Sequence, residues 1–291
     1  GSGAAAAEIP FAARANAGRH SARSQRDPPA AGHRGPVSRG TLEYTDVWKA
    51  AQRLTHKPVK LGACSVQWIE MYSNDQYYPK REDALMAMSE ALNEEHHALA
   101  DAGCPLIQIE EPALHFNPGG ELGLSQEFYV EALRLRGLRD KTEVWCHTCW
   151  GNPFAQRVEA GHAYASSLPY LDQLEVDVIT FETAANGGEE LAEIAAALGT
   201  DKKICIGVVQ HRNLEVETAA EVAALIRRAL EHVEPERLVI ISDCGFGRQG
   251  MSRTHAFYKM VSLVWGTNIV REELGLEPRP ILATDKRYAL M

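Results

Sequence analysis

The 291-residue chain lacks the features of several specialised protein classes. No window approaches 18 apolar residues, so we expect no membrane-spanning segment. Six cysteines are too few for a disulfide scaffold in a chain of this length. Basic residues are not in excess, and the net charge of −9 argues against nucleic-acid binding. Cys64 and Cys205 lie inside apolar runs, where a reduced cysteine packs as a small hydrophobe, which favours a reducing, cytoplasmic setting.

Residues 1–40 lack lysine and apolar periodicity, and they are rich in alanine and arginine. The stretch RDPPAAGHRGPVSRG has the chemistry of turns and coil. We therefore expect an irregular N-terminal tail over 1–40, followed by one domain over 41–291. The opening GSG could instead be a cloning remnant, and the arginine-rich, acid-poor composition resembles an organellar transit peptide, so organellar targeting stays an open alternative.

Six short apolar runs alternate with longer segments of helical spacing. The runs predict strands over 59–66, 105–110, 143–148, 176–182, 203–210 and 237–244. Strand followed by helix, repeated six times, predicts βαβ units and a parallel sheet. A doubly wound open sheet and a (β/α)8 TIM-type barrel both fit this pattern. No glycine-rich phosphate loop follows the early strands, because GFGRQG comes only after the last one.

Five consecutive predicted strands end in an acid, an imidazole or a thiol. These residues are Glu110 and Glu111, His147 and Cys149, Glu182, His211, and Asp243 and Cys244. Ligands of α/β folds bind beyond the carboxyl ends of the strands, so convergence from several strand ends favours the barrel, with only its last six units evident.

Each of these residues taken alone has an ordinary structural explanation. A cysteine at a strand end is usually a packed thiol, and a glutamate in FETA is usually a cap or an ion-pair partner. Together, His147, Cys149, Glu182 and Cys244 form a four-coordinate set of donors that suits Zn²⁺. His147 and Cys149 point the same way in an extended segment, whereas Cys146 points to the opposite side and is expected to pack in the core.

Four segments in this order resemble the catalytic domain of cobalamin-independent methionine synthase: LIQIEEPAL, WCHTCWGN, DVITFETA and ISDCGFGRQG. The resemblance covers about residues 57 to 275. The segments GVVQHRNLEVET and SDCGFGRQGMSR look closest to short single-domain members of this superfamily, a group that also includes zinc enzymes similar to epoxyalkane:coenzyme M transferase.

The resemblance implies a role for each matching residue. It makes His147, Cys149, Glu182 and Cys244 the zinc ligands, and it makes His211 a proton donor or a substrate contact. Glu110 matches an acid that contacts the amino group of the thiol substrate, although the family has aspartate there. Glu111 and Tyr72 are further candidate substrate contacts, and Tyr72 falls near an aromatic residue that stacks on the folate in the long enzymes.

The residues support thiol alkylation more strongly than they identify the alkyl donor. Zinc holds a thiol as thiolate, which is the nucleophile. A tertiary amine loses its methyl group only when its nitrogen gains a proton, which His211 could supply or relay, with or without Asp243. We therefore expect methyl transfer from a methyltetrahydrofolate-type donor to homocysteine, giving methionine. Homo-oligomer formation is a further open expectation.

Two other functions stay open, and the N-terminus bears on one of them, a remnant that lost its substrate pocket. The six predicted strands correspond to the last six of the family barrel, which would leave an open sheet edge unless the tail or a neighbouring subunit covers it. The alanine- and arginine-rich start could also replace the native N-terminus.

The first alternative function is a different enzymatic reaction, either thiol addition to an epoxide or the reverse cleavage of a thioether. The other alternative is a zinc-binding remnant without catalytic activity.

Overall fold

The computed structural model describes residues 32–40, 43–71, 73–111, 113–116, 124–133, 136–150, 163–247 and 251–281. These residues form two compact units, which are described separately. The first unit runs as far as Cys146 and includes Gln173–Val176. The second unit starts at His147 and holds Ala163–Asp172 and the chain from Asp177 onward.

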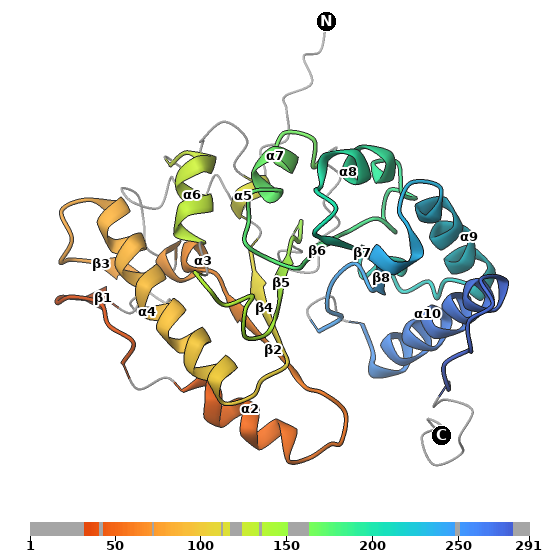
Figure 1. Cartoon of the computed structure of the whole chain (residues 1–291), viewed down its shortest axis with the longest axis horizontal. Helices are drawn as coiled ribbons and strands as arrows, with labels where there is room; N and C mark the ends of the chain where they lie inside the picture. The colour runs from red at the N-terminus through yellow and green to blue at the C-terminus, as the bar shows by residue number, and fades with distance from the viewer. Residues whose placement is uncertain are drawn as a thin grey trace, which may run out of the picture. The chain divides into compact units, whose positions relative to one another are not determined.

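The first unit alternates strands with helices, coloured orange to yellow-green in Figure 1. Its strands are β1 (Gly32–His33), β2 (Lys60–Cys64), β3 (Asn74–Asp75), β4 (Leu106–Glu110) and β5 (Glu143–His147), the last of which ends in the second unit. Its helices are α2 (Tyr44–Gln52), α3 (Val66–Met71), α4 (Arg81–Asp101), α5 (Ala113–Phe116) and α6 (Gln126–Ala132). The strand order is β2-β4-β5, and β2 pairs with β4 in parallel.

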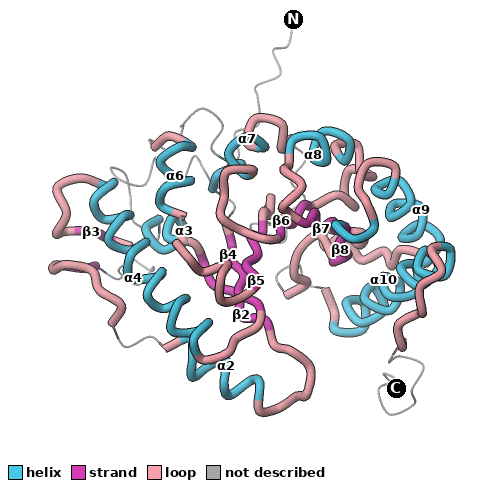
Figure 2. Tube along the Cα trace, viewed as in Figure 1, coloured by secondary structure: helices cyan, strands magenta, loops and turns pink. Residues whose placement is uncertain are grey.

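The second unit repeats the same alternation, coloured green to blue in Figure 1. Its elements are α7 (Leu168–Leu171), β6 (Val178–Phe181), α8 (Leu191–Ala197), β7 (Lys203–Gly207), α9 (Ala219–Leu230), the 3₁₀ helix η2 (Pro235–Arg237), β8 (Leu238–Ile241) and α10 (Arg253–Glu273). The strand order is β6-β7-β8, parallel throughout. Helices α8, α9 and α10 lie outside these strands (Figure 2).

Burial along the strands explains their apolar sequences. Every residue of β6 is buried, and so are the last four residues of β7. Continuous apolar strands are what a sheet covered on both faces requires. All residues of β8 are half-buried, as expected for the last strand of the β6-β7-β8 order. The prediction of six strands alternating with helices in an α/β fold is therefore confirmed.

Side-chain caps set where helices begin. Thr218 accepts the backbone N–H of Glu221, whose carboxylate in turn accepts the N–H of Thr218, so the two form a capping box at the start of α9. Ser125 and Ser252 cap α6 and α10 more simply, because each hydroxyl oxygen accepts one backbone N–H, from Phe128 and His255 respectively. A precise start of α9 matters because the loop before it reaches the candidate site described below.

The predicted boundary at residue 40 stays a prediction. Residues 1–31 and Tyr72 lie outside the described residues, whereas β1 at Gly32–His33 pairs with β3.

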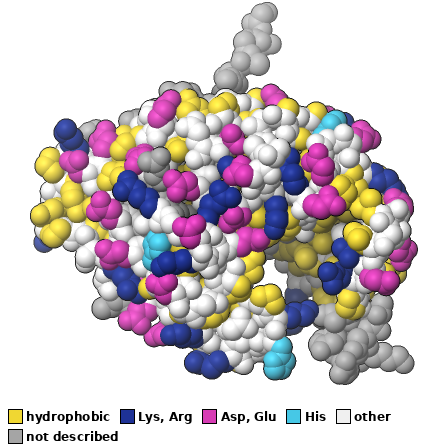
Figure 3. Space-filling model, viewed as in Figure 1, with side chains coloured by type: hydrophobic (Ala, Val, Ile, Leu, Met, Phe, Trp, Pro, Cys, Tyr) yellow, Lys and Arg dark blue, Asp and Glu magenta, His cyan; other side chains and the backbone are white. Residues whose placement is uncertain are grey.

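On the face drawn in Figure 3, lysine and arginine side chains are interspersed with aspartate and glutamate. Within the described residues, no helix combines the length and apolar character needed to cross a membrane.

Candidate metal centre

Two overlapping groups of possible metal ligands lie in the second unit. One contains His147, Cys149 and Cys244, and the other contains Glu182, His211 and Cys244. In each group the ligand atoms lie within 4.8 Å of one another. The sulfur atoms of Cys149 and Cys244 are 3.2 Å apart, although 95 residues separate them in the chain. Cys244 is common to both groups, so the donors gather around a single centre.

A hydrogen bond orients the ring of His147. Its Nδ1 lies 2.7 Å from the hydroxyl oxygen of Thr180 on β6, and both residues are buried. If Nδ1 carries the proton and donates it to this hydroxyl, Nε2 keeps the lone pair that a metal ligand needs. The hydroxyl of Thr148 donates a hydrogen bond to the carbonyl oxygen of Thr180, so the neighbouring residues His147 and Thr148 both contact Thr180.

Glu182 follows β6 and is held at both carboxylate oxygens. Oε1 accepts the backbone N–H of Trp150 at 2.9 Å, and Oε2 pairs with Nη2 of Arg212 at 2.7 Å. The side chains of Glu182 and Arg212 are 2% and 8% exposed, so this ion pair is shielded from water. Arg212 therefore balances one negative charge of the anionic cluster.

His211 is fully buried, and neither of its ring nitrogens has a hydrogen-bond partner. Buried polar groups are rarely left without a partner unless an ion, water or ligand completes them. Burial lowers the pKa of His211, while the nearby carboxylate of Glu182 opposes that shift. The ring is therefore neutral near pH 7 and has ring nitrogens available beside the cluster.

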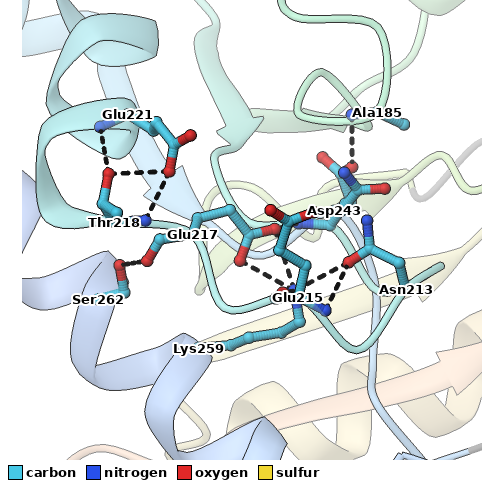
Figure 4. Close-up of polar contacts among 10 residues, drawn as sticks. Ala185, Asn213, Glu215, Glu217, Thr218, Glu221, Asp243, Lys259 and Ser262 are labelled. Atoms are coloured by element: carbon cyan, nitrogen blue, oxygen red, sulfur yellow. Dashed lines mark hydrogen bonds and ion pairs between the residues drawn. The ribbon is translucent and has the colours of Figure 1, made fainter.

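Asp243 anchors the loop that follows β6. Its Oδ1 accepts the backbone N–H groups of Thr183 and Ala184, both at 2.9 Å, and its Oδ2 accepts that of Ala185 at 3.1 Å (Figure 4 shows the Ala185 bond). Burial, followed by the charge of Glu182, raises the pKa of Asp243 to about 8, against the effect of the three N–H groups. Asp243 makes no hydrogen bond to His211, whose ring nitrogens have none, so its predicted catalytic role remains a prediction.

The donor set fits zinc. A hydrogen bond from Cys149, opposed by burial and helped by His147, lowers the pKa of the Cys244 thiol well below its usual range. Thiolate sulfur and imidazole nitrogen are the ligands that zinc prefers, and the orphaned ring of His211 marks an incomplete polar centre. His147, Cys149 and Cys244 form one group of possible ligands, whereas Glu182 is grouped with His211 and Cys244, so the role of all four residues as ligands stays a prediction.

The remaining predicted residues belong to other parts of the chain. Glu110 and Glu111 lie in the first unit, where Oε1 of the buried Glu111 accepts the N–H of Leu114 and so caps α5. Tyr72 lies outside the described residues. Cys146 is buried in the first unit and belongs to neither ligand group found among the described residues, as its expected packing role requires.

Sequence reasoning missed Arg212 and Thr180. Arg212 directly follows the predicted site residue His211, and Thr180 precedes the predicted ligand Glu182 by two positions within the predicted strand 176–182. Side chains two apart on a strand point to the same face, so this spacing is a signal for Thr180. Adjacency to His211 is a weaker signal for Arg212, because it does not specify the ion pair with Glu182.

Known proteins match most of the chain. A family model described as the catalytic domain of cobalamin-independent synthase matches residues 21–264. A methionine synthase from Saccharolobus islandicus is 36% identical over 209 residues, which are 72% of this chain and 56% of the relative. A methionine synthase from Thermococcus kodakarensis is 30% identical over 226 residues, or 78% of this chain and 61% of the relative.

A solved structure has a similar fold. The B12-independent methionine synthase from Shewanella sp. W3-18-1, determined in complex with selenomethionine, aligns with a TM-score of 0.69 and 25% identity. The alignment covers 84% of this chain and 71% of that one. The six strands alternating with helices are those of a partial TIM barrel, and the chain spans somewhat more than half the length of the curated relatives. The chain belongs to the cobalamin-independent methionine synthase catalytic-domain family.

Proposed function

We propose that this chain is a zinc-dependent thiol methyltransferase that converts homocysteine to methionine with a methyltetrahydrofolate-type donor. The observation that carries the proposal is the buried cluster in which two cysteine sulfurs, two imidazoles and a carboxylate meet around Cys244. The match to the family and the names of its relatives support the same reaction class.

In this proposal His147, Cys149, Glu182 and Cys244 hold the zinc ion, and Cys244 is the residue that both groups of possible ligands share. Zinc, when bound, would lower the pKa of the substrate thiol and keep its sulfur as the nucleophilic thiolate. The two cysteines and the glutamate make the site anionic, which preserves electron density on that sulfur. Arg212 moderates the negative charge through its 2.7 Å contact with Glu182.

His211 is proposed to relay the proton of the reaction. The thiol must lose a proton, and the nitrogen that releases the methyl group must gain one, so a single relay balances both steps. Burial keeps the imidazole of His211 neutral near pH 7, so the ring can accept the thiol proton before it donates to nitrogen. Asp243 is proposed to assist by fixing the loop beside Glu182.

Substrate contacts outside the cluster are also part of the proposal. Glu110 is proposed to contact the amino group of homocysteine, with Glu111 and Tyr72 as further substrate contacts. The carboxylate of Glu110 suits an ammonium group, because a charge-assisted hydrogen bond is stronger than a neutral one.

The test begins with metal content in reduced, freshly purified protein. We expect about one zinc per chain, lost in Cys149→Ser and in Cys244→Ser, because hydroxyl oxygen is a poorer zinc ligand than thiolate. Cys205→Ala is the matched control, since Cys205 is a fully buried thiol of the same unit that lies outside both ligand groups. It should keep its zinc.

Activity then separates the candidate reactions. Incubation with homocysteine and methyltetrahydrofolate should give methionine, and the two serine variants should give none. Zinc-free wild-type protein would overturn the proposed metal site. Zinc-loaded protein that ignores homocysteine but opens an epoxide with another thiol would favour the epoxide reaction. Inactivity with both electrophiles would favour a remnant without catalysis.

A further inference from the structure

A buried lysine that the proposed reaction does not use lies on α10. Lys259 is 0% exposed, and its ammonium group is surrounded by oxygen atoms of one loop. Nζ lies 3.0 and 2.9 Å from the two carboxylate oxygens of Glu217 and 3.5 Å from the side-chain oxygen of Asn213, and it also donates to the carbonyl of Glu215 (Figure 4). A charge removed from water needs such partners.

All of these oxygens belong to the loop between β7 and α9. Ser262, one turn after Lys259 on the same helix, donates its hydroxyl to the carbonyl of Glu217 (Figure 4). Asn213 also accepts the N–H of Glu215 at 3.1 Å, so the loop is braced internally. One face of α10 thus fixes this loop through several polar contacts.

The loop leads directly to the metal centre. Oε1 of Glu217 accepts the backbone N–H of Gln210 at 2.9 Å, in addition to its contact with Lys259. The next two residues, His211 and Arg212, place their side chains at Cys244 and Glu182. A continuous chain of contacts therefore runs from Lys259 through Glu217 to the backbone that presents both residues.

Other contacts besides this buried pair join α10 to α9. Arg227 on α9 and Glu273 on α10 form a two-bond ion pair at 2.9 and 2.6 Å, with side chains 47% and 46% exposed. Gly266 of α10 also packs closely on Val222 of α9. A buried ion pair often adds little to the free energy of unfolding. Its better-attested effect is to favour one specific packing of the segments that it joins.

We propose that Lys259 is a positioning residue: by holding Glu217, it fixes the β7–α9 loop so that His211 and Arg212 meet the metal centre. The expected effect of Lys259 on turnover rests on the methyltransferase function proposed above. Lys259 itself touches no proposed ligand or reacting atom. Its loss should therefore disturb turnover more than metal binding, because His147, Cys149 and Cys244 lie outside the loop.

The kinetic test compares Lys259→Met with Arg227→Met in zinc-loaded protein. We expect Lys259→Met to keep about one zinc per chain and a KM for homocysteine within about twofold, while kcat falls at least about tenfold through misplacement of the loop. Arg227→Met removes an ion pair to the same helix but not to the loop, and it should keep kcat within about twofold.

A second variant, Glu217→Gln, tests whether Lys259 acts through Glu217, and it can be measured even if Lys259→Met does not fold. Glu217→Gln should lower kcat by a similar factor, and the double variant Lys259→Met/Glu217→Gln should lose no more than either single variant, because both act through one contact. If Lys259→Met does not fold, Glu217→Gln carries the comparison. Unchanged kcat in the folded variants, or equal loss in Arg227→Met, would overturn the proposal.

An additional readout separates this proposal from the proposed function. If zinc-loaded wild type does not methylate homocysteine, the proposed function fails, and amide hydrogen exchange then decides the positioning claim. Lys259→Met should speed exchange at the amide of Gln210, which donates to Glu217, whereas Arg227→Met should not. Equal exchange at Gln210 in both variants would contradict the positioning role.

Discussion

Three of the four buried histidines in the described part of the chain occupy clearly different environments. His147 is oriented by Thr180, whereas the ring nitrogens of His211 and His96 have no hydrogen-bond partners. His211 has the metal cluster beside it. His96 lies on α4 in the first unit, and burial lowers its pKa to about 4, with the charge of Glu95 acting against that shift.

Because His96 is buried, we expect the free energy of unfolding to fall as the solution is acidified. Its folded pKa is depressed, so the unfolded chain takes up a proton first as the pH falls below about 6.5, and stability is lost between about pH 6.5 and 4. The loss from His96 between pH 7 and pH 5 should be about 2 kcal/mol. Urea unfolding of wild type and His96→Leu at both values measures it.

The matched control is His56→Gln, because His56 is an exposed histidine of the same unit. His96→Leu should lose about 2 kcal/mol less than wild type on acidification, and His56→Gln should behave like wild type. An equal loss in all three proteins would mean that His96 does not stay neutral in the fold.

At the scale of elements, the approach of β7 to the segment after β8 shapes the site. A Cβ atom at Gly207, the last residue of β7, would lie 2.0 Å from Oδ1 of Asp243 and 2.6 Å from its backbone nitrogen. The second contact is with backbone, which cannot rotate away. Glycine at this position therefore allows Asp243 to reach the loop after β6.

Gly207→Ala should destabilise the protein by about 3 kcal/mol, because the added methyl group forces these backbones apart. Gly245→Ala is the control, since a Cβ there would meet nothing within 4 Å. Urea unfolding of both variants measures the difference. If Gly207→Ala is as stable as Gly245→Ala, the close approach is not needed for the fold.

Sequence patterns predicted the elements well where local chemistry decides them. Apolar runs located all six main strands, and the spacing before α9 fits its capping box. Helix α8 starts only at Leu191, because Gly187 and Gly188 take φ angles of 66° and 78° in a turn. Helical residues require negative φ, so this turn delays the helix.

At the scale of the whole molecule, the metal centre draws on residues 147 to 244 of the second unit. The proposed metal site therefore lies within this one unit. From their order along the strand ends, the sequence predicted that His147, Cys149 and Cys244 lie close together, as they do, and their role as ligands stays a proposal. It could not predict the partners Arg212–Glu182 and Lys259–Glu217, because ion pairs between residues 30 and 42 positions apart leave no local pattern.

X-ray absorption at the zinc edge, with and without homocysteine, measures directly whether the substrate sulfur binds the metal. The resting protein should show about two sulfur neighbours, from Cys149 and Cys244, together with nitrogen and oxygen. Homocysteine should add one sulfur neighbour, because the account places its thiolate on the metal, and should do so in Cys205→Ala as well. A sulfur count that does not change with homocysteine, in protein that contains zinc, would contradict the account.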